Sequence, residues 1–204
     1  MLRRTGIAIA ALVAAWANAA LAQSSNDAEV LSSFQALAGK YEGVFSRTQF
    51  VVVRVQHQYV PQGAYVASAY EAKKVEYNVE RTTSLVSPFV GTIDVTFQHS
   101  LDDRVCGNVR HAKPLKSIAG WATADEAVEE ISKPECRTAR STFLDPVRFN
   151  FALQGGKWVL KSVVRTRYAR PETMIQAAIQ KESPDPQYTW VDVAPNRVWQ
   201  TLLP

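Results

Sequence analysis

The stretch Val147-Arg-Phe-Asn-Phe-Ala-Leu-Gln-Gly-Gly-Lys-Trp-Val-Leu-Lys-Ser-Val-Val-Arg165 decides the fold. Apolar and polar side chains alternate on both sides of Gly155-Gly156, as they do in two half-buried strands joined by a two-residue turn. Closing the turn between Gln154 and Lys157 predicts three apolar pairs: Leu153 with Trp158, Phe151 with Leu160 and Val147 with Val164. The stretch therefore predicts an antiparallel hairpin whose apolar face packs against another layer.

Two earlier segments, residues 51–59 and 64–79, alternate with the same period of two. A hairpin loop is expected at Pro61-Gln62-Gly63, with Val60 opposite Ala64, because glycine adopts the backbone angles that such loops require.

A corner at residues 84–88 leads into the next predicted strand, which begins at Phe89. The side-chain pattern places Val79 opposite Ile93 and Gly91 opposite Arg81, where a missing side chain leaves room. Together these segments predict a curved antiparallel sheet of about five to six strands.

Three segments have helical spacing. Asn26 and Glu29 fit a capping box at the start of an N-terminal helix, and Gly39 is the expected stop. Thr123-Ala-Asp-Glu126 predicts a short helix that ends before Pro134, and Pro171 opens a C-terminal helix. The apolar residues of the first and last helices are Val30, Phe34, Leu37 and Tyr41, and Met174, Ile175, Ala178 and Ile179.

The fold class predicted from these elements is α+β. The N-terminal helix packs on the sheet, and residues 101–140 form an insertion. The C-terminal helix is followed by a proline-rich tail, residues 183–204, which holds Trp190 and Trp199 and is expected to pack on the domain. Residues 23–182 are expected to form a single domain.

Residues 1–22 have the pattern of a cleavable signal peptide. A basic start at Arg3-Arg4 precedes an apolar run from Ile7 to Leu21, and Ala20-Leu-Ala22 is a suitable cleavage site. The alternative is a membrane anchor, but the run of about 15 residues is shorter than the roughly 20 that a spanning helix needs. A periplasmic or secreted location is predicted, with no membrane insertion after cleavage.

Two cysteines, Cys106 and Cys136, lie in the insertion. In an exported protein two cysteines most simply form one disulfide, which here would tie the two ends of the insertion together. The alternative is a metal site. Two cysteines without C-x-x-C spacing do not favour it, and no metal or cofactor is predicted.

The order of elements and the ending Gly155-Gly-Lys-Trp-Val-Leu-Lys-Ser162 resemble the cystatin-like/NTF2-like group of α+β proteins over residues 27–169. The resemblance implies a cone-shaped sheet around a helix, which in many members of the group holds a pocket. The group contains enzymes, secretion-system components and binding modules, so the resemblance implies no single function.

Catalytic candidates are few. His57 and His99 lie in register with the apolar face. One interpretation is that they form an acid–base pair in a pocket, with Asp94 or Asp102 as the orienting group. The other is that both histidines lie at the rim of the core. The chain has no nucleophile elbow, metalloprotease motif or phosphate loop. The absence of these motifs disfavours an enzyme but does not exclude one.

Two surfaces are candidates for binding. The first is the corner, with Leu85, Val86 and Phe89, where Leu85 and Val86 either tuck under a helix end or form the lip of a site. The second is a basic stripe, predicted on the sheet face opposite Phe149 and consisting of Arg148, Lys161, Arg165 and Arg167. Its alternative is an ordinary solvated face whose lysines and arginines prevent aggregation.

The leading functional hypothesis is an exported, non-catalytic binding or assembly module for a protein partner or a small ligand. The rival is a pocket hydrolase or isomerase that uses His57 or His99, and a third hypothesis is an inhibitor of an exported enzyme. The net charge of +4, half of which lies in Arg3 and Arg4, is too small to indicate nucleic-acid binding.

Overall fold

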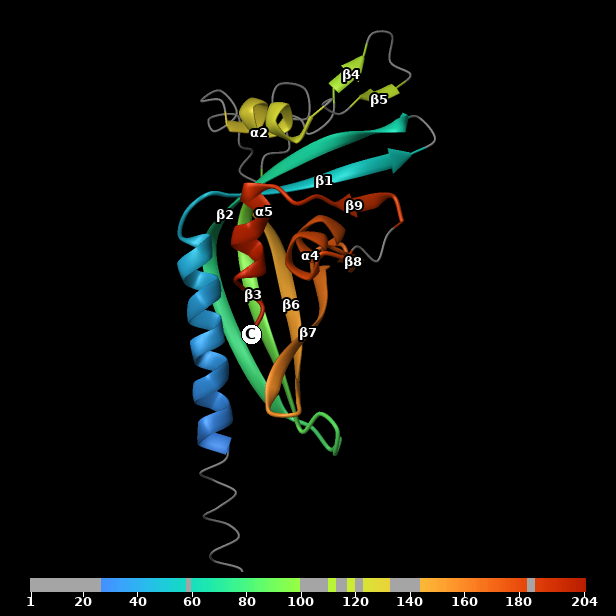
Figure 1. The fold of residues 1–204 in the computed structure, drawn as a ribbon. Coiled ribbons are helices and arrows are strands. Elements are labelled where there is room, and N and C mark those ends of the chain that lie inside the picture. The colour runs from blue at the N-terminus through green and yellow to red at the C-terminus, as the bar shows by residue number, and fades with distance from the viewer. Residues whose placement is uncertain are drawn as a thin grey trace, which may run out of the picture. The chain divides into compact units, whose positions relative to one another are not determined.

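The computed structural model describes residues 27–57, 60–99, 110–112, 117–119, 123–132, 144–182 and 186–204. The chain divides into two compact units, Met1–Ala36 and Leu37–Pro204, and the second holds every strand (Figure 1). The predicted signal peptide at residues 1–22 and the predicted disulfide of Cys106 and Cys136 lie outside the described residues.

The protein is an α+β protein with a curved, antiparallel, seven-stranded sheet in the order β8-β7-β6-β3-β2-β1-β9. The strands are β1 (Gln49–His57), β2 (Val60–Arg81), β3 (Phe89–His99), β6 (Leu144–Gln154), β7 (Lys157–Arg165), β8 (Arg170–Pro171) and β9 (Tyr188–Trp190). A separate two-stranded sheet consists of β4 (Arg110–Ala112) and β5 (Ser117–Ala119). The sheet exceeds the predicted five to six strands because β8 and β9 are too short to show alternation.

The β6–β7 hairpin confirms the predicted turn and corrects one pair. Leu153 pairs with Trp158 and Phe151 with Leu160, and Gly155 and Gly156 adopt φ angles of 56° and 75° in the turn. A bulge between Asn150 and Phe151 then shifts the register by one residue, so Val147 pairs with Arg165 instead of Val164. The extra residue moves the end of β7 onto the opposite face.

The β1–β2 hairpin turns earlier than predicted. Val55 pairs with Ala64 and His57 with Val60, so Pro61-Gln62-Gly63 lies within β2 and the predicted loop is wrong. Val51, Val52 and Val53 are all buried, which means that this part of the sheet is covered on both faces. The alternation of apolar and polar side chains specifies the register of a strand only where one face of the sheet is exposed. Both faces of β1 are apolar here, so the side-chain pattern does not specify its register.

The β2–β3 pairing differs from the prediction by two residues. Val79 pairs with Gly91 and Arg81 with Phe89, whereas Val79 was expected opposite Ile93. A shift of two leaves the side chains of β2 from Lys74 onward on their predicted faces, because the side-chain period of a strand is two. A bulge between Ala72 and Lys74 reverses the alternation before that point, so Tyr70 lies in the core.

The N-terminal helix covers residues 27–45 and does not stop at Gly39. Beyond the glycine, Tyr41 and Phe45 are fully buried and continue the helical spacing. The Tyr41 and Phe149 ring centroids are 4.9 Å apart, as are those of Phe45 and Phe97. Burying two large aromatic rings outweighs the cost of about 1 kcal/mol for a glycine inside a helix.

Helix α2 (Ala124–Ser132) covers β1 and β2 from the face opposite that core. It is joined to them by a buried cluster of Ala127, Val52, Ala67 and Ala69. Its capping box is confirmed: the Glu126 amide donates to Thr123 Oγ1 at 3.2 Å, and the Thr123 amide donates to Glu126 Oε2 at 3.2 Å.

Two further helices, α4 (Thr173–Gln180) and α5 (Ala194–Gln200), belong to the core side of the sheet. The Trp199 ring of α5 lies 5.0 Å from Phe45 and 5.5 Å from Tyr70, and its Nε1 donates to the Phe50 carbonyl at 2.8 Å.

The side chain of Asn196 completes the outer edge of β1 beside β9. Its Oδ1 accepts from the Val52 amide at 2.8 Å, and its Nδ2 donates to the carbonyls of Val52 at 2.6 Å and Val191 at 2.8 Å. None of the helices in the described part of the chain has the length and hydropathy needed to cross a membrane.

Candidate functional site

The corner loop, residues 82–88, is held by its own hydroxyl groups. The Thr82 amide donates to the Pro88 carbonyl at 2.8 Å, and Thr82 Oγ1 donates to the Ser87 carbonyl at 2.5 Å. The Ser84 amide donates to Thr82 Oγ1 at 3.1 Å, and the Ser87 amide donates to Ser84 Oγ at 3.2 Å. These bonds give the loop a defined conformation.

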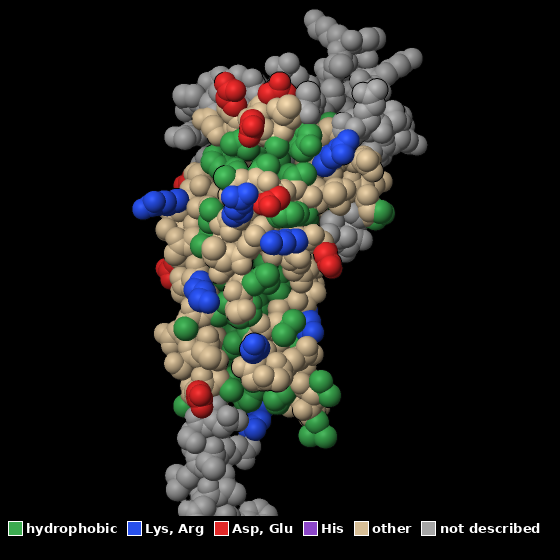
Figure 2. All heavy atoms as spheres, viewed as in Figure 1, with side chains coloured by type: hydrophobic (Ala, Val, Ile, Leu, Met, Phe, Trp, Pro, Cys, Tyr) green, Lys and Arg blue, Asp and Glu red, His purple; other side chains and the backbone are tan. Residues whose placement is uncertain are grey.

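The loop presents two adjacent apolar side chains to solvent. Leu85 is 99% exposed and Val86 is 74% exposed, whereas Phe89 is buried at the start of β3. Hydrophobic side chains of this segment protrude at the lower right of Figure 2. The interpretation that they tuck under a helix end is therefore wrong, and they form the apolar tip of the corner.

Neighbouring strands support the corner loop. Gln154 Nε2 donates to Ser87 Oγ at 3.1 Å, and Lys161 Nζ donates to Gln154 Oε1 at 2.8 Å. The Arg81 guanidinium lies 5.4 Å from the centroid of the Phe89 ring. The corner loop is thus tied to the end of β6, and Arg81 and Lys161 lie near its base.

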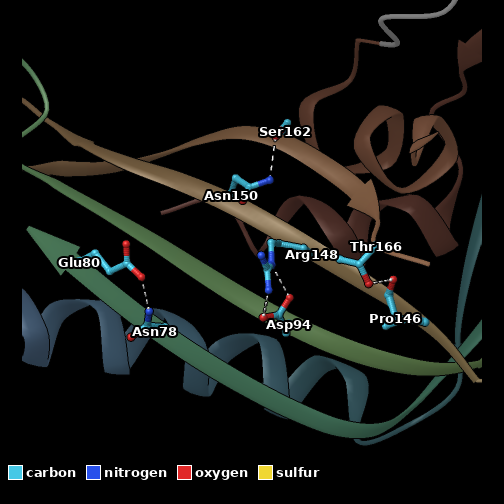
Figure 3. Close-up of polar contacts among 8 residues, drawn as sticks. All are labelled: Asn78, Glu80, Asp94, Pro146, Arg148, Asn150, Ser162 and Thr166. Atoms are coloured by element: carbon cyan, nitrogen blue, oxygen red, sulfur yellow. Dashed lines mark hydrogen bonds and ion pairs between the residues drawn. The ribbon is translucent and has the colours of Figure 1, made fainter. Parts of the chain in front are cut away.

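The predicted basic stripe does not form as a row of available charges. Arg148 makes a two-pronged pair with Asp94 on the neighbouring strand, with Nε to Oδ1 at 2.7 Å and Nη2 to Oδ2 at 2.9 Å (Figure 3). Arg167 lies in the turn at residues 166–169, 5.6 Å from the Tyr168 ring. Arg165 lies on the core face, because Lys161 is an extra, bulged residue in β7.

The face that carries Arg148 is an ordinary polar sheet face. Asn78 donates to Glu80 at 2.9 Å along β2, and Asn150 of β6 donates to Ser162 of β7 at 3.0 Å (Figure 3). These contacts favour a solvated, aggregation-resistant face over a binding stripe.

A charge cluster of Arg165, Glu172 and Asp145 lies on the core side of the sheet. Arg165 Nε forms an ion pair with Glu172 Oε2 and lies 3.3 Å from Asp145 Oδ2. Glu172, just before α4, is only 3% exposed. Burial raises the pKa of Glu172, the Arg165 guanidinium opposes that rise, and Asp145 adds to it.

Tyr70 of β2 extends the charge cluster into the core. Its side chain is 1% exposed, and its hydroxyl interacts with Arg165 and Ser68. Burial, with the nearby Glu172 carboxylate, raises the pKa of Tyr70, so the phenol is neutral at physiological pH. Burial acts to lower the pKa of Arg165, but Tyr70, Glu172 and Asp145 together raise it, so Arg165 is always charged.

A pocket of about 350 Å³ lies beside the charge cluster. Its walls include Arg165, Tyr168, Arg170, Glu172, Thr173 and Tyr188. The pocket therefore combines two guanidinium groups, one buried carboxyl group and two aromatic rings. These groups come from β7, the turn after it, β8, the residue before α4, and β9. Its volume falls in the range of small-molecule sites.

The two histidine candidates are placed only through their backbone. His57 pairs with Val60 and His99 pairs with Tyr70 at the ends of β1 and β3. Their side chains lie outside the described part of the structure, so the acid–base role stays a prediction. Asp94, one proposed orienting group, is instead paired with Arg148.

No cluster of metal-ligating side chains occurs among the described residues. The arrangement that is described is suited to binding: a rigid apolar tip at the corner loop, and a pocket with opposite charges. Neither contains a nucleophile aligned with a base.

Comparison with known proteins identifies no family for this chain. No protein-family model matches it, and neither a curated protein nor a solved structure resembles it significantly. The resemblance to the cystatin-like/NTF2-like group therefore stays a prediction.

Sequence reasoning missed the charge cluster and the pocket. The sequence pattern singled out Pro171 as a helix start and not the neighbouring Glu172, and the inward position of Arg165 depends on a one-residue bulge. Asp145 and Tyr70 are far from both in the chain. The position of Glu172 did indicate an ion pair, because a carboxylate beside the start of a buried helix needs a cationic partner.

Proposed function

We propose that the protein is an exported, non-catalytic binding module that docks a protein partner through the corner loop. The observation that carries this proposal is the exposure of Leu85 and Val86, 99% and 74%, on a loop fixed by hydroxyl hydrogen bonds. A soluble protein gains nothing from holding two adjacent apolar residues rigidly in water, whereas a preformed apolar tip fits a complementary pocket at low entropic cost.

The chemistry of the partner follows from the tip and its surroundings. An apolar pocket would receive Leu85 and Val86, and an acidic rim would face Arg81 and Lys161, which lie beside the loop. Burying both apolar side chains would contribute about 3 kcal/mol, or about a hundredfold in affinity.

The test begins with a photoreactive amino acid in place of Val86, in cells of the organism that encodes the protein. The partner that becomes crosslinked is then purified and its affinity measured. The double change Leu85→Ser and Val86→Ser should weaken binding about a hundredfold. The matched control is Val198→Ser with Leu203→Ser, since both residues are 38% exposed apolar positions elsewhere.

Equal affinity of the tip variant and wild type would overturn the proposal. So would cosedimentation of the wild-type protein with phospholipid vesicles that is lost in the tip variant, because the tip would then dock on a membrane. Replacing His57 and His99 with alanine tests the enzyme rival: if a folded double variant keeps full function, the rival is removed.

Export is the second part of the proposal, and it rests on the signal-peptide pattern of residues 1–22. The mature protein should begin near Gln23 and be found in the periplasm or the medium. N-terminal sequencing of the purified protein checks this, and a membrane-bound form that retains Met1 would contradict it.

A further inference from the structure

The pocket beside the charge cluster has a charge balance that selects its ligand. Arg165 and Arg170 are the cationic groups at its wall, Glu172 is the anionic one, and Asp145 contacts Arg165 from β6. These four charges cancel when all are ionised. Once Glu172 holds a proton, the site carries one net positive charge, which a single anionic group would neutralise.

The shape and lining of the pocket indicate the rest of the ligand. A guanidinium group is planar and matches a carboxylate in a two-pronged arrangement. Tyr168 and Tyr188 line the same pocket and offer aromatic faces to a flat apolar body. A volume of about 350 Å³ suits a molecule of roughly the size of one substituted ring.

We propose that this pocket binds a small aromatic or similarly flat carboxylate, and that binding is accompanied by uptake of one proton at Glu172. Arg170, whose side chain is exposed, meets the carboxylate at the mouth of the pocket. Arg165 is held in place by Asp145 and Glu172 and supplies the inner positive charge. Tyr70 stays a neutral phenol and does not take part in the proton exchange.

The experiment uses benzoate as the probe and benzamide as its uncharged counterpart, with the full mature protein in a titration calorimeter. Benzoate should bind with a dissociation constant on the order of 1 mM, as expected for so small a ligand. Benzamide should bind at least tenfold more weakly, because it cannot form charge-assisted hydrogen bonds with the guanidinium groups.

Two arginine variants locate the site. Arg170→Gln should lower benzoate affinity about tenfold. Arg197→Gln removes the same charge from α5, outside the pocket wall, where the Arg197 side chain is 65% exposed, and so benzoate affinity should be unchanged. Equal losses in the two variants, or no loss in Arg170→Gln, would contradict a specific contact.

The pH dependence of benzoate binding tests the proposed proton uptake at Glu172. Benzoate affinity should rise as the pH falls from about 8 towards about 5, where benzoate itself remains ionised. In Glu172→Gln the dependence should disappear, because the amide cannot take up a proton. The proposal fails if benzoate does not bind at about 10 mM and pH 5, if benzamide binds equally well, or if the pH dependence persists in Glu172→Gln.

Discussion

At the scale of single residues, Glu172 gives the fold a pH dependence of known sign. Its pKa is raised in the folded state by burial, so the folded protein holds this proton more tightly than the unfolded chain does. The resulting stabilisation is fully present below the unfolded pKa of about 4.3 and is lost as the pH rises through the folded pKa.

Wild type should therefore lose stability relative to Glu172→Gln as the pH rises from about 4, and the difference should level off above the folded pKa of Glu172. Urea unfolding at a series of pH values measures it. Glu76→Gln is the control, because it removes a carboxylate whose side chain is 60% exposed. A constant difference between wild type and Glu172→Gln would contradict the raised pKa.

Asn196 shows how one buried amide supports a strand. Asn196→Ala leaves the buried N–H and C=O groups of Val52 without their partner, which should lower the free energy of unfolding by about 3 kcal/mol. Asn150→Ala loses a single hydrogen bond to Ser162 on the polar face and should cost about 1 kcal/mol or less. Chemical denaturation compares the two, and equal costs would contradict the role given to Asn196.

At the scale of elements, glycines in the helix and in the turn should respond oppositely to alanine. Gly39→Ala adds a Cβ that meets no atom within 4 Å and should stabilise the helix at residues 27–45 by about 1 kcal/mol. Gly155 has a φ of +56°, which alanine rarely adopts, so Gly155→Ala should destabilise the hairpin by roughly 1 kcal/mol. Thermal unfolding of both variants checks the two signs, and stabilisation by Gly155→Ala would contradict the turn geometry.

The sequence predicted an element correctly where a local pattern, such as a turn or a capping box, allows few backbone conformations. The Gly155-Gly156 turn fixed the pairs next to it, and the capping box of Thr123 and Glu126 placed the start of α2. The bulge at Asn150 leaves no trace in the alternation of side chains, so Arg165 was assigned to the wrong face. The charge cluster followed from that bulge and was missed with it.

Helix ends and doubly covered strands were predicted least well, for tertiary reasons. Gly39 is a local stop signal, but the burial of Tyr41 and Phe45 against the sheet overrides it. The corner loop is the opposite case. Its bend followed from Pro88, while the exposure of Leu85 depends on the absence of a covering helix in the described structure, which no local pattern reports.

At the scale of the whole molecule, the predicted disulfide would bound the insertion between β3 and β6. Cys106 and Cys136 should show no free thiol when the mature protein is alkylated under denaturing, non-reducing conditions, because the proposed export would bring both cysteines into an oxidising environment. Mass spectrometry counts the labels, and a sample reduced first should carry two. Two labels without reduction would contradict the disulfide.

The core also joins distant parts of the chain, since Trp199 contacts Phe45, Tyr70 and Phe97.

The edge of β1 has a consequence for the timing of folding. β1 is synthesised early, yet residues late in the chain complete its outer edge. β9 pairs with it, Asn196 binds the Val52 backbone, and Trp199 Nε1 donates to the Phe50 carbonyl. Until those residues leave the ribosome, the sheet lacks its last strand and the Val52 backbone lacks its partner. The outer edge of β1 therefore cannot be completed before residues 188–196 have been synthesised.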